Sequence, residues 1–152
     1  TASMLALGAI VLLKDDAARA AMRDDDAAAA PLVEELLRHL SVVQVAFPRF
    51  ARHALRVGEQ QIEEGDVVVV SLSAANREEA SDFDAGRAAS SHLAFGHGAH
   101  RCVGAELARM ELRAAYPALL RRFPNLRLAD ARPAFRTASI VHGVDSLLVH
   151  TR

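Results

Sequence analysis

Residues 95–104 read Phe-Gly-His-Gly-Ala-His-Arg-Cys-Val-Gly, and this stretch contains the only cysteine of the 152-residue chain. Its glycines, Gly96, Gly98 and Gly104, permit backbone angles and close approaches that a side chain forbids, so the loop can lie flat against a bulky group. Cys102 stands just before a helical pattern. Because backbone N–H groups at the start of a helix favour a thiolate, the sequence predicts a cysteine able to bind a metal.

Two other interpretations of Cys102 are open on the residues alone. A lone cysteine is often a small buried hydrophobe. Alternatively, His97, His100 and Cys102 form a zinc-binding module, since imidazole and thiolate are usual ligands of that metal. A fourth ligand is hard to find, because there is no second cysteine and the other histidines are scattered singly at positions 39, 53, 92, 142 and 150.

The stretch resembles the cysteine loop of the cytochrome P-450 family, whose pattern is Phe-Gly-x-Gly-x-His/Arg-x-Cys-x-Gly. The residues at its fixed positions here are Phe95, Gly96, Gly98, His100, Cys102 and Gly104. The resemblance implies that they bind haem b (iron protoporphyrin IX), with the Cys102 thiolate as the proximal ligand of the iron. It also implies that Phe95 packs beside the sulfur and that His100 reaches a haem propionate.

The opening run, residues 1–13, is apolar almost all round, as expected of a buried helix, and is too short to span a bilayer. It begins without a helix cap and looks like a helix cut in its middle. Its start, Thr-Ala-Ser-Met-Leu-Ala-Leu-Gly, resembles the second half of the family's long central helix. By that resemblance the acid–alcohol pair that delivers protons lies upstream of Thr1, and no catalytic residue is assigned within the chain.

A further helix is predicted from Pro31, which suits the first turn and is followed by an apolar stripe at helical spacing. Periodicity alone predicts a solvated pair between Glu34 and Arg38 at i, i+4 on the opposite face. The resemblance implies instead that Glu35 and Arg38 form the family's Glu-x-x-Arg, a buried ion pair that helps to hold the cysteine loop.

The third member of that ionic cluster departs from the family pattern. Family members have an arginine before the cysteine loop, whereas this chain is shorter there and has Asp82 at the matching position. A carboxylate beside Glu35 adds a like charge, and a buried charge without a partner is costly. Either Arg77 or Arg87 replaces the missing cation or the triad is broken, and the like charge favours a broken triad and unstable haem incorporation.

Two segments resemble the walls of the family's substrate pocket. Residues 41–50 resemble its pocket-lining strand, in which Arg49 would be a second propionate partner. Residues 135–144 resemble the last hairpin, whose tip reaches the substrate. The implied contacts with an apolar small-molecule substrate are Val42, Val43, Val45, Ala46, Ser139, Ile140 and Val141.

The chain after the cysteine loop has apolar residues at helical spacing, which predicts a helix. Its predicted apolar face consists of Val103, Leu107, Met110 and Ala114. The family docks an acidic ferredoxin or flavodoxin as electron donor on this side of the haem. The candidates for that contact are Arg101, Arg109 and Arg113.

Composition and charge set limits on the class of protein. Hydrophobic residues make up 51% of the chain, enough for one sizeable core. The net charge of -1 shows no excess of positive charge that would attract nucleic acid or an anionic membrane, so neither is expected as a partner. A single cysteine excludes an internal disulfide, which fits a cytoplasmic protein.

The resemblance implies a mainly α fold with small β-sheets (α+β), the C-terminal portion of the cytochrome P-450 fold. Residues 1–152 would form the C-terminal fragment of a single domain: the end of the central helix, the Glu-x-x-Arg helix, a small sheet, the cysteine loop, the proximal helix and the terminal hairpin. The resemblance implies a haem-thiolate monooxygenase that inserts one oxygen atom of O2 into an apolar small molecule, with the missing N-terminal part as a further partner. The alternative is a non-catalytic or decayed remnant that binds haem weakly or serves only structurally.

Overall fold

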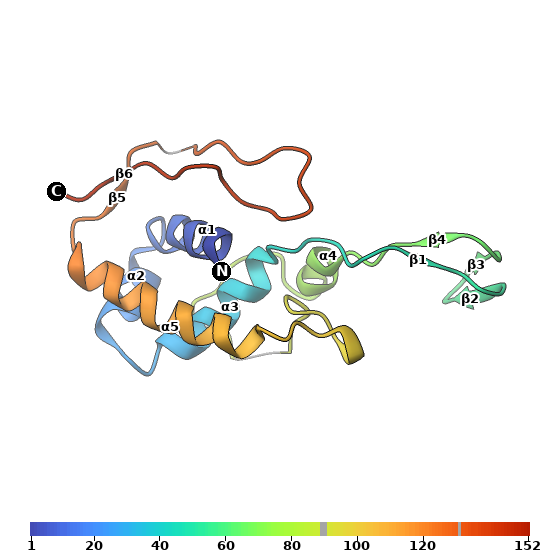
Figure 1. The fold of residues 1–152 in the computed structure, drawn as a ribbon. Coiled ribbons are helices and arrows are strands. Elements are labelled where there is room, and N and C mark those ends of the chain that lie inside the picture. The colour runs from blue at the N-terminus through green and yellow to red at the C-terminus, as the bar shows by residue number, and fades with distance from the viewer. Residues whose placement is uncertain (89–90, 131) are drawn as a thin grey trace.

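The computed structural model describes residues 1–88, 91–130 and 132–152, which are mainly α-helical with small antiparallel sheets (Figure 1). The predicted fold class is confirmed. The helices are α1 (Ala2–Leu12), α2 (Asp16–Asp24), α3 (Ala29–Leu40), α4 (Leu72–Arg77) and α5 (Ala105–Arg122), with one 3-10 turn, η1 (Gly98–His100). The strands are β1 (Arg49–Phe50), β2 (Leu55–Val57), β3 (Gln60–Ile62), β4 (Val67–Val68), β5 (Arg127–Leu128) and β6 (Val149–His150).

Helices α1, α2, α3 and α5 pack together and form the core. Because α1 is apolar around its circumference, it buries residues on several faces. Helix α3 turns one stripe inward, with Leu32, Val33 and Leu36 almost fully buried. Helix α2 is capped by Asp15, whose carboxylate accepts the N–H of Ala18 at 2.9 Å, a contact that stabilises a helix start by about 1 kcal/mol.

The buried face of α5 is not the predicted one. The side chains that α5 buries among the other helices are Ala105, Leu112, Tyr116, Pro117 and Leu120. The predicted apolar face is exposed at Val103, Leu107, Met110 and Ala114. Helix α5 carries two apolar stripes, and periodicity alone does not say which of them faces the core. The packing against α1, α2 and α3 selects the stripe that contains the larger tyrosine and leucine side chains.

Helices α1 and α5 meet closely at Gly8 and Tyr116. The Tyr116 side chain is almost fully buried, and its hydroxyl donates a hydrogen bond to the carbonyl oxygen of Met4. A Cβ atom at Gly8 would lie 1.9 Å from that hydroxyl oxygen. Burial raises the pKa of Tyr116, so the phenol remains a neutral donor at physiological pH. The glycine is therefore required by its neighbour on α5.

Gly8→Ala is expected to lower the free energy of unfolding by about 1–3 kcal/mol, because the added methyl group overpacks the contact with Tyr116. At an open helical position the same change would stabilise by about 1 kcal/mol. In a Tyr116→Ala background the clash is absent, so Gly8→Ala should become stabilising. Urea denaturation of the four proteins measures this cycle, and a Gly8→Ala effect of the same sign in both backgrounds would contradict the contact.

The strands between α3 and α4 form an arm that extends away from the helices (Figure 1, right). Strand β1 pairs antiparallel with β4, and β2 pairs antiparallel with β3. Gly58, with φ of 58°, makes the turn between β2 and β3, in a left-handed conformation that favours glycine. The small sheet expected here thus consists of two separate two-stranded ribbons within the described residues.

The C-terminal segment runs back over the helices on the side of α1, and β5 pairs with β6 (Figure 1). Between these strands the chain reaches the segment that follows α3. An isolated antiparallel bridge joins Val43 to Val141, and the N–H of His142 donates to the carbonyl oxygen of Val42 at 2.7 Å. The last hairpin is thereby tied to the end of the Glu-x-x-Arg helix.

Candidate functional site

The cysteine loop is closed by its own backbone. The N–H of Cys102 donates to the carbonyl oxygen of Phe95 at 2.8 Å, and the N–H of Gly96 donates to Leu93 at 2.9 Å. Gly96 and Gly98 have φ of 70° and 74°, which favours glycine at both positions. Two of the three loop glycines therefore have the backbone angles that glycine permits, whereas Gly104, with φ of -88°, has an ordinary conformation.

Cys102 lies at the head of α5 with its side chain exposed. Its carbonyl oxygen accepts the N–H of Ala105, the first residue of the helix, at 3.3 Å. The interpretation of this cysteine as a buried hydrophobe is therefore wrong. The thiol is accessible to a metal at the start of the helix.

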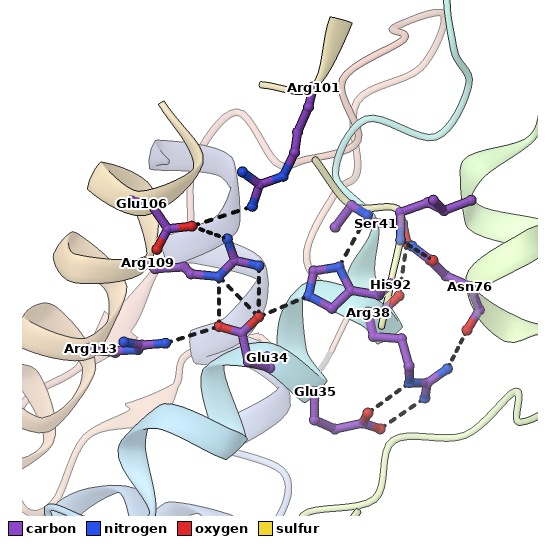
Figure 2. Close-up of polar contacts among 12 residues, drawn as sticks. Glu34, Glu35, Arg38, Ser41, Asn76, His92, Arg101, Glu106, Arg109 and Arg113 are labelled. Carbon is purple, nitrogen blue, oxygen red and sulfur yellow. Dashed lines mark hydrogen bonds and ion pairs between the residues drawn. The ribbon is translucent and has the colours of Figure 1, made fainter. Parts of the chain in front are cut away.

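Glu35 and Arg38 form a buried ion pair on α3, with side chains only 3% and 6% exposed (Figure 2). The contact is bidentate, with Arg38 Nε 2.7 Å from Glu35 Oε2 and Nη2 2.9 Å from Oε1. Arg38 also donates to the carbonyl oxygens of Asn76, Ala80 and Asp82 at 2.6, 2.8 and 3.0 Å. The pair therefore fixes the course of the chain between α4 and the cysteine loop.

The expectation of a broken triad is wrong, because Arg87 supplies the second cation. Its Nε lies 3.3 Å from Glu35 Oε2, and the N–H of Asp84 donates to Glu35 Oε1 at 3.0 Å. Asp82 contributes only its backbone carbonyl to the cluster, and its side chain is exposed. The shortened segment turns so that its carbonyl groups face Arg38 and the aspartate faces solvent, which removes the like-charge conflict.

Burial alone would raise the pKa of Glu35. The hydrogen bond from Arg38, the N–H of Asp84, the charge of Arg38 and the contact with Arg87 together outweigh burial and hold the pKa below its usual value. The carboxylate therefore remains charged at neutral pH, as an ion pair with these arginines requires.

Two buried polar residues, Ser41 and Asn76, were not singled out in the sequence. The Ser41 hydroxyl donates to the carbonyl oxygen of Arg38 and accepts from the Asn76 amide, both at 2.8 Å. Asn76 Oδ1 in turn accepts the N–H of Leu93 at 2.6 Å. These bonds connect the end of α3 to residues 92–95, the limb that leads into the cysteine loop. The signal in the sequence was a polar residue directly after an apolar helix, which marks a cap.

Glu34 is not part of a solvated pair with Arg38. Its carboxylate contacts Arg109 and Arg113 of α5 and His92 before the cysteine loop (Figure 2). Arg109 is only 14% exposed and also bonds Glu106. Its charge is therefore satisfied inside the protein, whereas Arg101 and Arg113 are about half exposed, at 49% and 42%.

The residues implied to face haem propionates and substrate come from several elements. His100 lies in η1 and Arg49 in β1, and both are exposed. Of the implied pocket residues, Val43 and Val141 are brought together by their bridge, whereas Val45 pairs with Ser71 and Ala46 donates to the carbonyl oxygen of Val70. Ser139 and Ile140 are exposed at the tip of the last hairpin, and Val42 is half-buried beside the bridge.

The zinc alternative has no support. Among residues 1–88, 91–130 and 132–152, no three His, Cys, Asp or Glu side chains are grouped so that they could hold a metal ion. His97, His100 and Cys102 are all exposed and point to no shared ligand set. In the same part of the chain, no helix is both long enough and apolar enough to cross a bilayer.

A buried Glu-x-x-Arg pair combined with a glycine-bounded cysteine loop at the head of a helix is the arrangement of the cytochrome P-450 family. The chain belongs to that family, since the family model "Cytochrome P450" matches residues 29–141. The matched range includes the Glu35–Arg38 pair and the whole cysteine loop.

The relatives are bacterial cytochromes P-450. The chain is 47% identical to cytochrome P-450 105C1 of a Streptomyces species, covering 98% of this chain and 41% of the relative. It is 43% identical to cytochrome P-450 FAS1 of Rhodococcoides fascians, covering 97% and 38%. Among solved structures, the P-450 monooxygenase TamI with bound tirandamycin C superposes with a TM-score of 0.93 at 38% identity, covering 99% of this chain and 39% of that one. The chain thus spans roughly two fifths of the length of these relatives.

Proposed function

We propose that residues 1–152 are the C-terminal part of the single domain of a haem-thiolate monooxygenase, and that Cys102 is the thiolate ligand of haem b. The placement of Cys102 carries this proposal. It is an exposed thiol at the head of α5, on a loop whose entry is bonded to the buried Ser41–Asn76 pair and to the partly buried Glu34 cluster. A thiol in that position is accessible to iron, and its thiolate is the form that would bind the metal.

The residues around Cys102 fit such a cofactor. Gly96 and Gly98 keep side chains away from the loop surface, and the adjacent Val103 is fully exposed and available to pack on an apolar ring. His100 and Arg49 would pair with the propionates, and Phe95 and Gly104 flank the ligand. When bound, a thiolate-ligated haem supplies the oxygen activation needed to insert one oxygen atom of O2 into a C–H bond or a double bond.

We further propose an apolar small-molecule substrate. The tie between Val43 and Val141 supports a pocket wall made from the segment after α3 and the last hairpin. That wall would consist of Val42, Val43, Val45, Ala46, Ser139, Ile140 and Val141.

For the electron donor, a ferredoxin or flavodoxin in the cytoplasm, the exposed Arg101 and Arg113 are better placed than Arg109. The charge of Arg109 is taken up by Glu34 and Glu106. Arg101 and Arg113 also contact Glu106 and Glu34, but their side chains are 49% and 42% exposed against 14% for Arg109. Their charges therefore reach solvent and can attract an acidic partner.

The test is haem reconstitution of the chain. Reduced under carbon monoxide, the complex is expected to show the strongly red-shifted Soret band of thiolate ligation. A histidine-type spectrum would contradict ligation by Cys102. A chain that takes up no haem would favour the non-catalytic remnant.

A further inference from the structure

We propose that Glu34 is a positioning residue for the cysteine loop, acting through His92 and Arg109 on the limb formed by residues 92–95. The role deepens the proposed function and rests on it, because this limb leads into the loop that presents Cys102. Glu34 precedes the glutamate of the Glu-x-x-Arg pair, and its carboxylate faces a different set of partners (Figure 2).

Both oxygens of Glu34 are fully used. Oε1 accepts from Arg109 Nε at 2.8 Å and from Arg113 Nη2 at 3.2 Å. Oε2 accepts from Arg109 Nη2 at 2.9 Å and contacts His92 Nε2 at 3.1 Å. One carboxylate on α3 thereby joins α5 to the limb before the cysteine loop. A carboxylate with this many charge-assisted bonds has little freedom to move.

His92 receives its orientation from this carboxylate. Its side chain is 3% exposed, and its Nδ1 accepts the N–H of Ala94 at 3.2 Å. Because Nδ1 is an acceptor, the proton of the neutral ring lies on Nε2, which donates to Glu34. The glutamate thus fixes both the tautomer and the plane of a ring whose other nitrogen binds the backbone of the limb.

Arg109 also contacts this limb, at Phe95. Its guanidinium group lies over the ring of Phe95, 4.8 Å from the centroid, and the His92 ring lies 6.3 Å from that centroid. The Phe95 ring is therefore contacted by two side chains that are both bonded to Glu34. The Phe95 carbonyl oxygen accepts the N–H of Cys102, so a displacement of Phe95 would also move the backbone of Cys102.

The Glu35–Arg38 cluster does not duplicate this role. Its arginine binds carbonyl groups at residues 76–82, and among the described residues it is linked to the limb through Asn76, directly and by way of Ser41. Neighbouring residues of a helix point about 100° apart, so the two glutamates of α3 hold different segments. A change at Glu34 should therefore disturb Phe95 and the thiol while the chain between α4 and Arg87 stays in place.

The test uses Glu34→Gln, which keeps the shape of the side chain and removes its charge and one acceptor oxygen. In the haem-free chain, nitrogen and carbon NMR should show a changed environment of His92 Nε2, which loses its carboxylate partner, and a changed environment of the Phe95 ring. In the haem-loaded chain, haem affinity should fall about 10-fold, as for other residues that orient a metal ligand. Glu106→Gln is the matched control, because Glu106 binds the same Arg109 from an exposed position and should leave all three signals unchanged.

Each outcome of these measurements either supports or contradicts the proposed role of Glu34. If Glu34→Gln lowers the melting temperature but leaves the His92 and Phe95 signals in place, Glu34 is only a stabilising contact and the proposal is overturned. If that variant does not fold, Arg109→Lys keeps the charge, loses the two-point contact with Glu34, and should show the same Phe95 change. A wild-type chain without haem affinity would contradict the proposed function, and the NMR signals would still decide the role of Glu34.

Discussion

Cys102→Ser is expected to abolish the red-shifted Soret band of the reduced carbon-monoxide complex. The band requires an anionic sulfur on the iron, and a serine hydroxyl is neither soft nor ionised at neutral pH. The backbone bond from residue 102 to Phe95 and the start of α5 do not involve the side chain, so the loop should keep its conformation. Difference absorbance at equal protein and haem concentrations measures the result.

His97→Ala and His100→Ala are the controls. Both side chains are exposed on the same loop, so they test whether a histidine is the true ligand. The red-shifted band should persist in both variants, with a weaker haem affinity for His100→Ala because the proposed propionate contact would be lost. A histidine-type spectrum in the unmutated chain that survives in Cys102→Ser and disappears in either histidine variant would assign the ligand to that histidine.

Arg38→Ala is expected to lower the free energy of unfolding by about 3–5 kcal/mol, the range for breaking a buried ion pair by removing one partner. The variant leaves Glu35 buried with only the Arg87 contact and the N–H of Asp84, and it removes the donor shared by three carbonyl groups. Arg38→Lys should lose most of the same stability, because an ammonium group cannot reproduce the fork that reaches both the carboxylate and the carbonyls.

Arg113→Ala serves as the control for an exposed ion pair. Arg113 meets Glu34 at 3.2 Å but is 42% exposed, so its removal should cost less than about 1 kcal/mol. Urea denaturation measures each variant. Equal losses for Arg38→Ala and Arg113→Ala would show that the Glu35 cluster contributes no more than a surface contact.

The pH dependence should separate the wild type from Arg38→Ala. In the wild type the pKa of Glu35 is lowered, so its contribution is present above its unfolded value of about 4.3 and is lost as pH falls through the folded value. In Arg38→Ala, burial is less compensated and the pKa should rise above the unfolded value. The free energy of unfolding of the variant should then rise relative to that of the wild type as pH falls. The difference in this free energy between the two proteins should therefore narrow in acid. A constant difference from pH 7 to pH 3 would contradict the assigned pairing.

The parts of the fold that sequence reasoning predicted are those determined by local pattern. The all-round apolar character of residues 1–13 indicates a buried helix whatever packs against it, and it is α1. The glycines of the cysteine loop indicate backbone angles that a side chain forbids, and Gly96 and Gly98 have such angles. Both conclusions depend on residues that are close together in the chain.

The parts that could not be predicted depend on partners distant in sequence. Glu34 and Glu35 are adjacent and chemically alike, and only the packing of α5 and the turn at Asp84 decide which of them binds Arg109 and which binds Arg38. Likewise, Arg87 replaces the expected arginine because the shortened segment folds back onto α3. Pattern matching by position placed Asp82 in the cluster, since it counts residues and does not follow the path of the chain.

The contact between Gly8 and Tyr116 has an evolutionary consequence. A larger residue at position 8 meets the phenol, and a smaller residue at position 116 leaves a cavity that costs about 3–5 kcal/mol. A substitution at either position alone would produce a destabilised protein, so the two residues are expected to change together or not at all. Among homologous chains, those with a small residue at the position of Tyr116 should be the ones that carry alanine or a larger residue at the position of Gly8, and lineages that retain the tyrosine should retain the glycine.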